Sequence, residues 1–350
     1  TGAESAEVQA TVRETIGADG RIVLSIDAVN QVFLFGDSCA NIWNLHETNP
    51  QWADFPQNPT RLDTSKDLYY LANRLILNGM VDASACADGG VGNNFATPCG
   101  MEAARSEATS WQNQFDLSIW MAAQSRGIPP RIIKTLVEIE SQFWPSNDRQ
   151  YVDEIGLGQV NQLGMDVLLR QNPDLYQQVC SSVFPECYTP FGQLTETAQA
   201  MLRGTLVQVF DASCPTCAYG IDLNKAQESV DYLALALRSN CAQVKLVLDS
   251  YDVVSGYEDA WKYTLVSYHS GIGCLLEGFE VTDQKNWQYN WANVSMNFEC
   301  AGAADYVNRF WNSLSSFDQY VVLPEESDMP YSAVVVLPPS PTPQPTPVLS

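Results

Sequence analysis

The most regular pattern in the chain is a run of apolar residues at helical spacing that follows Pro129 and Pro130. Two prolines suit the first turn of a helix, where a missing N–H costs nothing. The apolar residues then recur every three or four positions and predict one buried face, made of Ile132, Ile133, Leu136, Val137 and Phe143. Glu140 falls on this face. A carboxyl group on an apolar face loses hydration, so we expect Glu140 to be largely buried in a cleft with a raised pKa, as a general acid requires.

Glu140 has a second interpretation, because it also lies near the end of its helix. There its carboxylate could reach around the apolar face into water, and this helix alone does not decide between the two. Glu138 lies off the apolar face. Its separation of four residues from Lys134 predicts a solvent-exposed ion pair between the two side chains.

Helical patterns continue along most of the chain, and we therefore expect a mainly α fold. No strand ladder of any length is visible. A short strand-like run of β-branched residues lies at 333–337, while 21–26 reads either as a short strand or as the lead into a helix. Further helices are predicted at 68–76, 101–126, 165–170, 194–210, 227–238 and 301–310.

Changes in composition divide the chain into three parts. A turn cluster rich in Gly and Asn at 88–94 separates an N-terminal region, residues 1–95 and mixed or mostly α, from a main domain at 96–325. Residues 326–350 form the third part, whose closely spaced prolines predict an extended Pro-rich tail or linker. Such a tail spaces a domain from a wall, an anchor or another domain. It could also hold a neighbouring subunit in a homo-oligomer or a surface assembly.

The chain of 350 residues carries a net charge of −23, from 41 acidic and 18 basic residues. This balance argues against nucleic acid and against anionic membrane surfaces as partners, because both require a basic face. It suits an extracellular protein kept in solution by self-repulsion. No apolar run reaches transmembrane length. The sequence opens at Thr1 without a signal peptide, which fits a mature exported protein, although a chain shortened by other means would look the same.

Ten cysteines predict several disulfides, and with them an exported protein of the extracellular space or cell envelope. Sequence alone does not fix their pairing. A zinc site or a redox pair at the single Cys-x-x-Cys is a weaker alternative, because the chain has two His residues in all and no βαβ pattern surrounds the motif. We expect neither a metal nor a cofactor. Local candidates for pairing are Cys86 with Cys99, Cys180 with Cys187, and Cys214 with Cys217.

Three short segments carry the candidate chemistry. The helix described above ends in Glu140-Ser141, with Pro145 shortly after it. The second segment is Gly-Leu-Gly-Gln-Val at 156–160, and the third is Tyr-His-Ser-Gly at 268–271. In this order they resemble the signature of the soluble lytic transglycosylase family, relatives of goose-type lysozyme. The family pattern is a helix ending Glu-Ser-x-x-x-Pro, then Gly-Leu-Met-Gln-Ile, then Ala-x-x-Tyr-Asn-x-Gly.

The resemblance, which covers roughly residues 109–300, implies a lysozyme-like catalytic domain that acts on the glycan strands of peptidoglycan. It implies cleavage of the β-1,4 bond between N-acetylmuramic acid and N-acetylglucosamine with a single carboxyl group. Glu140 would first protonate the leaving oxygen. It would then act as a base while the muramic acid C6 hydroxyl closes a 1,6-anhydro ring. Two-carboxylate glycosidases, in contrast, need a second Asp or Glu.

The other matched residues would form the substrate groove. Ser141 would bind the substrate or steady the helix end. Gly156 and Gly158 would let the backbone approach a sugar closely, or simply form a turn. Gln159 would offer its amide to an N-acetyl group, and the Tyr268 hydroxyl would reach the catalytic carboxyl or the sugar.

The sequence departs from the family pattern at several of these positions. Gly158 stands where the family has Met, and His269 stands where it has Asn and adds a group that titrates near neutrality. Gln162 and Ile272 stand where Pro is common. These departures, and a negative charge that suits an anionic wall polymer poorly, support a second hypothesis: a non-catalytic extracellular structural or surface-assembly protein on the same fold. An enzyme should have an open groove at Glu140, and a structural protein a blocked one.

Two acidic residues, Asp153 and Glu154, precede the Gly-Leu-Gly-Gln segment. They could position a water molecule and make the enzyme a hydrolase, although a solvated edge is the simpler expectation. Aromatic residues near the three segments could stack on sugar faces or belong to the core, namely Phe143, Trp144, Tyr151, Trp287, Tyr289 and Trp291.

Overall fold

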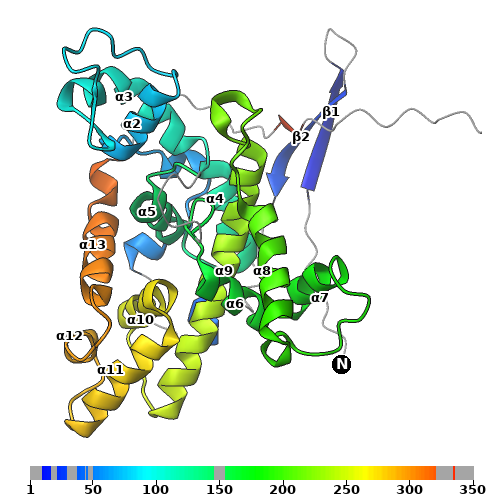
Figure 1. Cartoon of the computed structure of the whole chain (residues 1–350), viewed down its shortest axis with the longest axis vertical. Coiled ribbons are helices and arrows are strands. Elements are labelled where there is room, and N and C mark those ends of the chain that lie inside the picture. The colour runs from blue at the N-terminus through cyan, green and yellow to red at the C-terminus, as the bar shows by residue number, and fades with distance from the viewer. Residues whose placement is uncertain are drawn as a thin grey trace, which may run out of the picture. The chain divides into compact units, whose positions relative to one another are not determined.

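The fold is described from a computed structural model of the chain (Figure 1). The structure describes residues 38–43, 45, 50–145 and 154–320, and the backbone of three strands. The chain divides into two compact units, residues 1–34 with 324–350, and residues 35–323. The boundary expected near residue 95 therefore lies inside the second unit, and the boundary expected after 325 lies close to the observed division. The Pro-rich run at 338–347 lies outside the described residues.

The first unit contains a three-stranded antiparallel sheet in the order β1 (Ala10–Ile16), β2 (Ile22–Val29) and β5 (Val334–Val335). β1 and β2 pair along their length, with a bulge between Thr11 and Val12. The expectation that no strand ladder exists was wrong here, because residues 10–16 are dense in Thr, Val and Ile, which favour extended backbone. The strand interpretation of 21–26 and the strand-like run at 333–337 both agree with the observed sheet.

The second unit is built from α-helices, so the expected mainly α fold is confirmed. A short hairpin, β3 (Val91–Gly92) with β4 (Phe95–Ala96), lies between α2 and α3. None of the described helices is long and apolar enough to cross a membrane. The helices are α1 (Cys39–Ile42), α2 (Tyr69–Leu77), α3 (Pro98–Asn113), α4 (Asp116–Arg126), α5 (Pro130–Ser141), α6 (Gln162–Gln171), α7 (Pro173–Ser181), α8 (Glu196–Phe210), α9 (Leu223–Ser250), α10 (Tyr257–Ser270), α11 (Ile272–Gln284), α12 (Trp291–Ser295) and α13 (Ala303–Ser315).

The long helix α9 organises this unit. It packs against α1, α4, α6, α8, α10 and α11, and it runs between them in Figure 1. Its buried residues include Leu233, Leu237 and Val244, which recur at helical spacing and face the main core. The helix predicted at 227–238 therefore lies in the first part of a longer one. The helices that were not predicted are α1, α7, α10, α11 and α12.

The continuous helical pattern at 101–126 forms two helices. α3 ends at Asn113 and α4 begins at Asp116, so the chain turns at Gln114 and Phe115. Phe115 is fully buried, and Asp116 points inward to a buried lysine. Tertiary packing therefore overrides a local pattern that would allow one helix.

Helix α5 presents the apolar face that the sequence predicts. Ile132, Ile133, Leu136 and Val137 have no exposed surface, and Phe143 follows them into the core. These side chains belong to the same core cluster as the inner face of α9. The position of Glu140 at the end of α5 is thus set by a fully packed helix.

Lys134 is also buried on α5, and it forms an ion pair with Asp116 of α4 at 2.7 Å. Its ammonium also donates to the carbonyl of Leu62 and to the side chain of Asn113. The expected ion pair between Lys134 and Glu138 was therefore wrong. A side chain of this length can reach the interior when a buried carboxylate receives it, which the helical spacing alone does not reveal.

Glu138 instead pairs with Lys66 at 2.6 Å and accepts a hydrogen bond from Ser313 of α13.

Burial shifts the pKa values of both members of the Lys134–Asp116 pair. It raises the pKa of the Asp116 carboxyl to about 7, against the opposing effect of Lys134, and it lowers the pKa of Lys134. Each charge is costly in the interior, so each depends on the other.

All ten cysteines are paired in five disulfides, which agrees with the expectation of a disulfide-rich protein. The three local pairs are those predicted, including Cys214 with Cys217 in place of a zinc site. The two remaining bonds join distant segments: Cys39 to Cys241, which ties α1 to α9, and Cys274 to Cys300.

Lys134→Met is expected to reduce the free energy of unfolding by about 3 to 5 kcal/mol, because it leaves the buried Asp116 carboxylate without a partner. Replacing both residues, as Lys134→Met with Asp116→Leu, should recover much of this loss. Lys245→Met removes one partner of an exposed pair with Asp249 and should cost less than about 1 kcal/mol. Urea unfolding at pH 7 measures all three, and equal losses in Lys134→Met and Lys245→Met would contradict the role of burial.

The deficit of Lys134→Met should also depend on pH. A carboxyl group whose folded pKa is raised holds its proton more tightly in the folded state, so the stability it provides is lost as pH rises through the folded pKa. Asp116 already has a folded pKa of about 7 beside Lys134, and loss of Lys134 raises it further. The variant should therefore lie closer to wild type at pH 5 than at pH 8.

The disulfides should differ greatly in their contribution to stability. Cys39–Cys241 closes a separation of 202 residues and Cys214–Cys217 one of 3. Loop-closure entropy gives roughly 5 kcal/mol for the first and below roughly 2 kcal/mol for the second. Thermal unfolding of the two double Cys→Ala variants measures the difference, and thiol titration of the denatured wild type should find no free thiols.

Candidate active site

Glu140 occupies the last turn of α5, and the end of this helix is held in place by its neighbours. α5 stops at Ser141 because Gln142 and Phe143 adopt left-handed backbone conformations, with φ of 47° and 63°. The Gln142 side chain accepts hydrogen bonds from the backbone N–H groups of Tyr70 and Leu71, which open α2. The Cα of Glu140 is therefore fixed from both sides.

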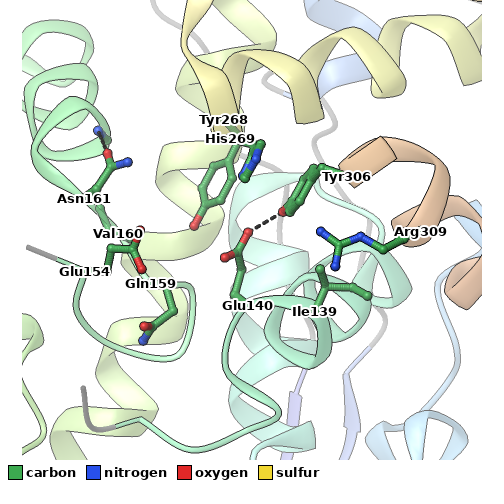
Figure 2. Close-up of a pocket in the computed structure, with 11 residues that line it drawn as sticks. Ile139, Glu140, Glu154, Gln159, Val160, Asn161, Tyr268, His269, Tyr306 and Arg309 are labelled. Carbon is green, nitrogen blue, oxygen red and sulfur yellow. Dashed lines mark hydrogen bonds between the residues drawn. The ribbon is translucent and has the colours of Figure 1, made fainter. Parts of the chain in front are cut away.

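The half-buried Glu140 side chain lines a cavity of about 320 Å³. Figure 2 shows its carboxyl group pointing between Tyr306 and Tyr268. α5, the loop before α6, the start of α6, α10 and α13 all contribute to the wall. The lining residues are Ile139, Glu140, Glu154, Gln159, Val160, Asn161, Gly164, Tyr268, His269, Tyr306 and Arg309.

The Gly-Leu-Gly-Gln segment forms a tight turn beside the cavity. Ile155 and Val160 close it with two backbone hydrogen bonds of 3.1 and 2.9 Å. Gly156 has a φ of +72°, a conformation that glycine adopts freely. The Gln159 amide donates to the Gly156 carbonyl at 2.8 Å, so the side chain is folded back onto its own turn.

Gly158 allows a close contact between this turn and α10. The Tyr268 hydroxyl donates to the Gly158 carbonyl at 2.5 Å. A Cβ at position 158 would lie 2.6 Å from the Leu233 Cδ1 atom and 2.9 Å from the Tyr268 hydroxyl. The space beside Gly158 is thus filled by protein, so a larger side chain does not fit at this position without displacing Leu233 or Tyr268.

Tyr306 of α13 donates a hydrogen bond to the Glu140 carboxyl oxygen Oε1. Burial and the nearby charge of Glu140 raise the pKa of Tyr306 well above its ordinary value. The same two causes, with Glu154 in addition, raise the pKa of Tyr268. Both hydroxyls therefore stay protonated at physiological pH and act as hydrogen-bond donors.

His269 stacks on Tyr306, with ring centroids 3.9 Å apart and the planes nearly parallel. Burial and the charge of Arg309 lower the pKa of His269. The imidazole is consequently neutral at pH 7, so it can donate one hydrogen bond and accept another. The stacked pair forms one wall of the cavity, with the Arg309 guanidinium beside it (Figure 2).

Of the seven site residues that the sequence predicts, the structure brings four to the cavity: Glu140, Gln159, Tyr268 and His269. Ser141 is not among the lining residues. It is buried, and its hydroxyl donates to the Val137 carbonyl at 3.0 Å, which is the helix-steadying alternative.

Gly156 and Gly158 shape the turn that lies next to the cavity. A Cβ at Gly156 would lie 3.2 Å from Ser229, so both glycines face other parts of the protein and shape the turn. They do not line the cavity itself. Glu154 does line it and is half-buried, which differs from the solvated edge expected for this residue. Asp153 and Tyr151 lie outside the described residues.

Sequence reasoning did not identify Tyr306 and Arg309. They lie beyond the segments that carry the motifs, and 166 positions separate Tyr306 from Glu140. The amphipathic pattern of α13 marks Tyr306, Val307 and Phe310 only as a buried face. Of the aromatic residues considered for sugar stacking, Phe143 and Trp144 are fully in the core, while Trp287 is exposed away from the cavity lining.

Within the described part of the chain, no group of three His, Cys, Asp or Glu side chains could hold a metal ion. Comparisons with protein-family models, curated proteins and solved structures found no match to this chain. Any function assigned to the cavity therefore rests on its geometry and on the three sequence motifs.

Gly158→Ala is expected to destabilise the protein by about 1 to 3 kcal/mol, because the added methyl group overlaps Leu233 and the Tyr268 hydroxyl. Gly204→Ala is a matched control, since no atom lies within 4 Å of its added Cβ and the residue is inside α8. That change should be neutral or stabilising by up to about 1 kcal/mol. Thermal unfolding compares them, and an unaffected Gly158→Ala variant would contradict the packing described here.

Proposed function

We propose that the protein is an exported lytic transglycosylase that cleaves the β-1,4 bond between N-acetylmuramic acid and N-acetylglucosamine in peptidoglycan. One observation carries the proposal: the carboxyl of Glu140 lies in an open cavity that is also lined by Gln159, Tyr268 and His269. These four residues come from all three motif segments. A cavity at this position favours an enzyme over a structural protein with a blocked groove.

In the first step Glu140 donates its proton to the glycosidic oxygen as the bond to C1 of muramic acid breaks. Glu140 becomes a carboxylate. The hydrogen bond from Tyr306 stabilises this charge, because hydrogen bonds to an ionised acceptor are stronger than neutral ones. The stacked His269 keeps the Tyr306 ring in position.

In the second step the Glu140 carboxylate accepts the proton of the C6 hydroxyl of the same sugar, and the hydroxyl oxygen bonds to C1. A 1,6-anhydro ring forms, and Glu140 regains its proton. One carboxyl group serves twice, so the chemistry needs no second carboxylate.

A hydrolytic variant of this reaction has one observation in its favour. Glu154 lines the same cavity, and its charge contributes to raising the pKa of Tyr268. A carboxylate in this place could orient a water molecule toward C1. Hydrolysis would release reducing-end sugars, whereas transglycosylation releases 1,6-anhydro sugars.

Export is inferred from the cysteines. Five disulfides are typical of proteins that mature in an oxidising compartment. The partners proposed are therefore glycan strands outside the cytoplasm. A homo-oligomer or surface assembly through residues 326–350 remains an expectation from sequence.

Glu140→Gln is expected to abolish glycan cleavage while leaving the fold intact. Glutamine keeps the shape of the side chain and can still accept from Tyr306, but it can neither donate the proton nor take it back. General acid–base catalysis is worth about 100- to 10,000-fold, and more where one group acts twice. Mass analysis of fragments released from purified peptidoglycan provides the measurement.

Glu277→Gln, an identical change at an exposed position of α11, is the matched control and should behave as wild type. Release of 1,6-anhydro fragments by wild type supports transglycosylation. Reducing-end products that depend on Glu154 would favour hydrolysis. No release by the wild type would overturn both in favour of the non-catalytic alternative.

Tyr306→Phe should lower kcat by about 10- to 100-fold, since it removes one hydrogen bond to a charged group. The phenyl ring keeps the stacking on His269, so the fold and the affinity for substrate should change little. The measurement is the rate of fragment release at saturating substrate. An unchanged kcat would show that the contact with Glu140 has no part in the reaction.

A further inference from the structure

The disulfide between Cys214 and Cys217 differs from the other four because neither of its cysteines is buried. A thiolate attacks a disulfide only where it can reach a sulfur atom, so exchange depends on access. Cys214–Cys217 is therefore the one bond that a thiolate can approach from either cysteine. Every other disulfide has at least one cysteine with no more than 6% of its surface exposed, namely Cys39 and Cys241, Cys86, Cys180 and Cys274.

The residues around this bond leave room for a partner. It lies in the connection between α8 and α9, and the two residues that it encloses, Pro215 and Thr216, are both exposed. Ala218 and Tyr219 follow directly and are also exposed, Tyr219 to 47%. A run of small and apolar side chains next to an accessible disulfide gives a second protein a surface to contact.

Backbone hydrogen bonds hold the connection in shape independently of the disulfide. The Cys214 N–H donates to the Gly220 carbonyl at 2.9 Å, and the Cys217 N–H donates to the Cys214 carbonyl at 2.9 Å. Ala212 and Ile221 anchor the base of the connection in the main core. The bond closes a separation of only 3 residues, so its loss costs the fold little. After reduction the two thiols would stay close together and could form the bond again.

Thr216 distinguishes the two sulfur atoms. Its hydroxyl lies 3.7 Å from the Cys214 Sγ atom, and a disulfide sulfur carries no hydrogen, so the hydroxyl is the donor. Such a bond strengthens when the acceptor becomes an anion. A stabilised thiolate is also the better leaving group. Cys214 is therefore the sulfur that leaves, and Cys217 is the sulfur that is attacked.

We propose that Cys214–Cys217 is a reversible site of thiol–disulfide exchange, which accepts electrons from a dithiol protein of the same compartment. A thiolate of the partner attacks the Cys217 Sγ atom, the S–S bond breaks, and Cys214 leaves as a thiolate that takes up a proton. The partner's second thiol then attacks the mixed disulfide and releases Cys217. Two electrons and two protons pass from the partner, which becomes a disulfide, to the two cysteines, which become thiols. This inference is independent of the chemistry proposed for the cavity.

The test compares the five disulfides in the folded, full-length protein. The protein is equilibrated in dithiothreitol at increasing ratios of reduced to oxidised reagent, quenched with acid and alkylated, and each cysteine is then located by mass analysis. Cys86–Cys99 is the internal control, because Cys99 is exposed and Cys86 is buried. Cys214 and Cys217 should be alkylated at a ratio about 10-fold lower than this pair, or lower still. Circular dichroism should show an unchanged fold, and added oxidised reagent should restore the bond.

Two further measurements test the partner and the order of attack. Reduced thioredoxin, used as a protein dithiol probe, should reduce the same bond and leave the other four oxidised. Thr216→Val should slow reduction by dithiothreitol by about 2- to 10-fold, as for the loss of one hydrogen bond. Thr205→Val makes the same change inside α8, outside the connection, and should reduce at the wild-type rate. An unchanged rate in Thr216→Val would overturn the assignment of Cys214 as the leaving sulfur.

Three results would overturn the exchange site itself. One is reduction of another disulfide before Cys214–Cys217 or together with it. Another is reduction of this bond only after the fold is lost. The third is reduction by dithiothreitol but not by thioredoxin, because the surface would then exclude a protein dithiol. A variant with Cys214→Ser and Cys217→Ser should keep its eight cysteines unlabelled at the ratios that reduce this bond in the wild type.

Discussion

The ion pair between Lys134 and Asp116 fixes the helix on which the candidate site depends. Both side chains are almost fully buried, so neither charge is tolerable without the other. The pair locks the middle of α5 to the start of α4, while Gln142 ties its C-terminal end to α2. Glu140 lies between these two attachments. Its carboxyl group meets Tyr306 because α5 has little freedom to rotate or slide.

The Lys134–Asp116 pair also helps to explain which parts of the fold could be predicted from the sequence. The buried face of α5 was predicted correctly, because apolar residues that recur at helical spacing are visible in the local sequence. The break between α3 and α4 was not predicted, because nothing local opposes one long helix. It arises where Asp116 must turn inward to reach Lys134, which is a contact between elements. The sheet of residues 10–29 was predicted only in part: a strand was one interpretation of 21–26, whereas its partner at 10–16 was not predicted, because pairing between strands is a contact between segments.

The candidate site could be predicted in part for a similar reason. The motif residues Glu140, Gln159, Tyr268 and His269 do line one cavity, since residue type and order already indicate where chemistry lies. The orientation of a side chain depends on what surrounds it. Gln159 turns back to its own backbone, which the sequence could not indicate. Tyr306 and Arg309 could not be predicted from the sequence, because they lie beside Glu140 only through the packing of α13, a helix distant in sequence.

Local charge makes an acidic chain compatible with the anionic substrate proposed above. Charges more than about 8 Å apart are largely screened at physiological salt, so the total of −23 has little influence on a ligand inside the cavity. Among the described residues that line the cavity, the charged side chains are Glu140, Glu154 and Arg309, with His269 neutral. In the proposed first step Glu140 is protonated, and Arg309 then offsets Glu154 among these described residues. An acidic surface and a cavity that accepts the proposed acidic sugar are therefore compatible in one chain.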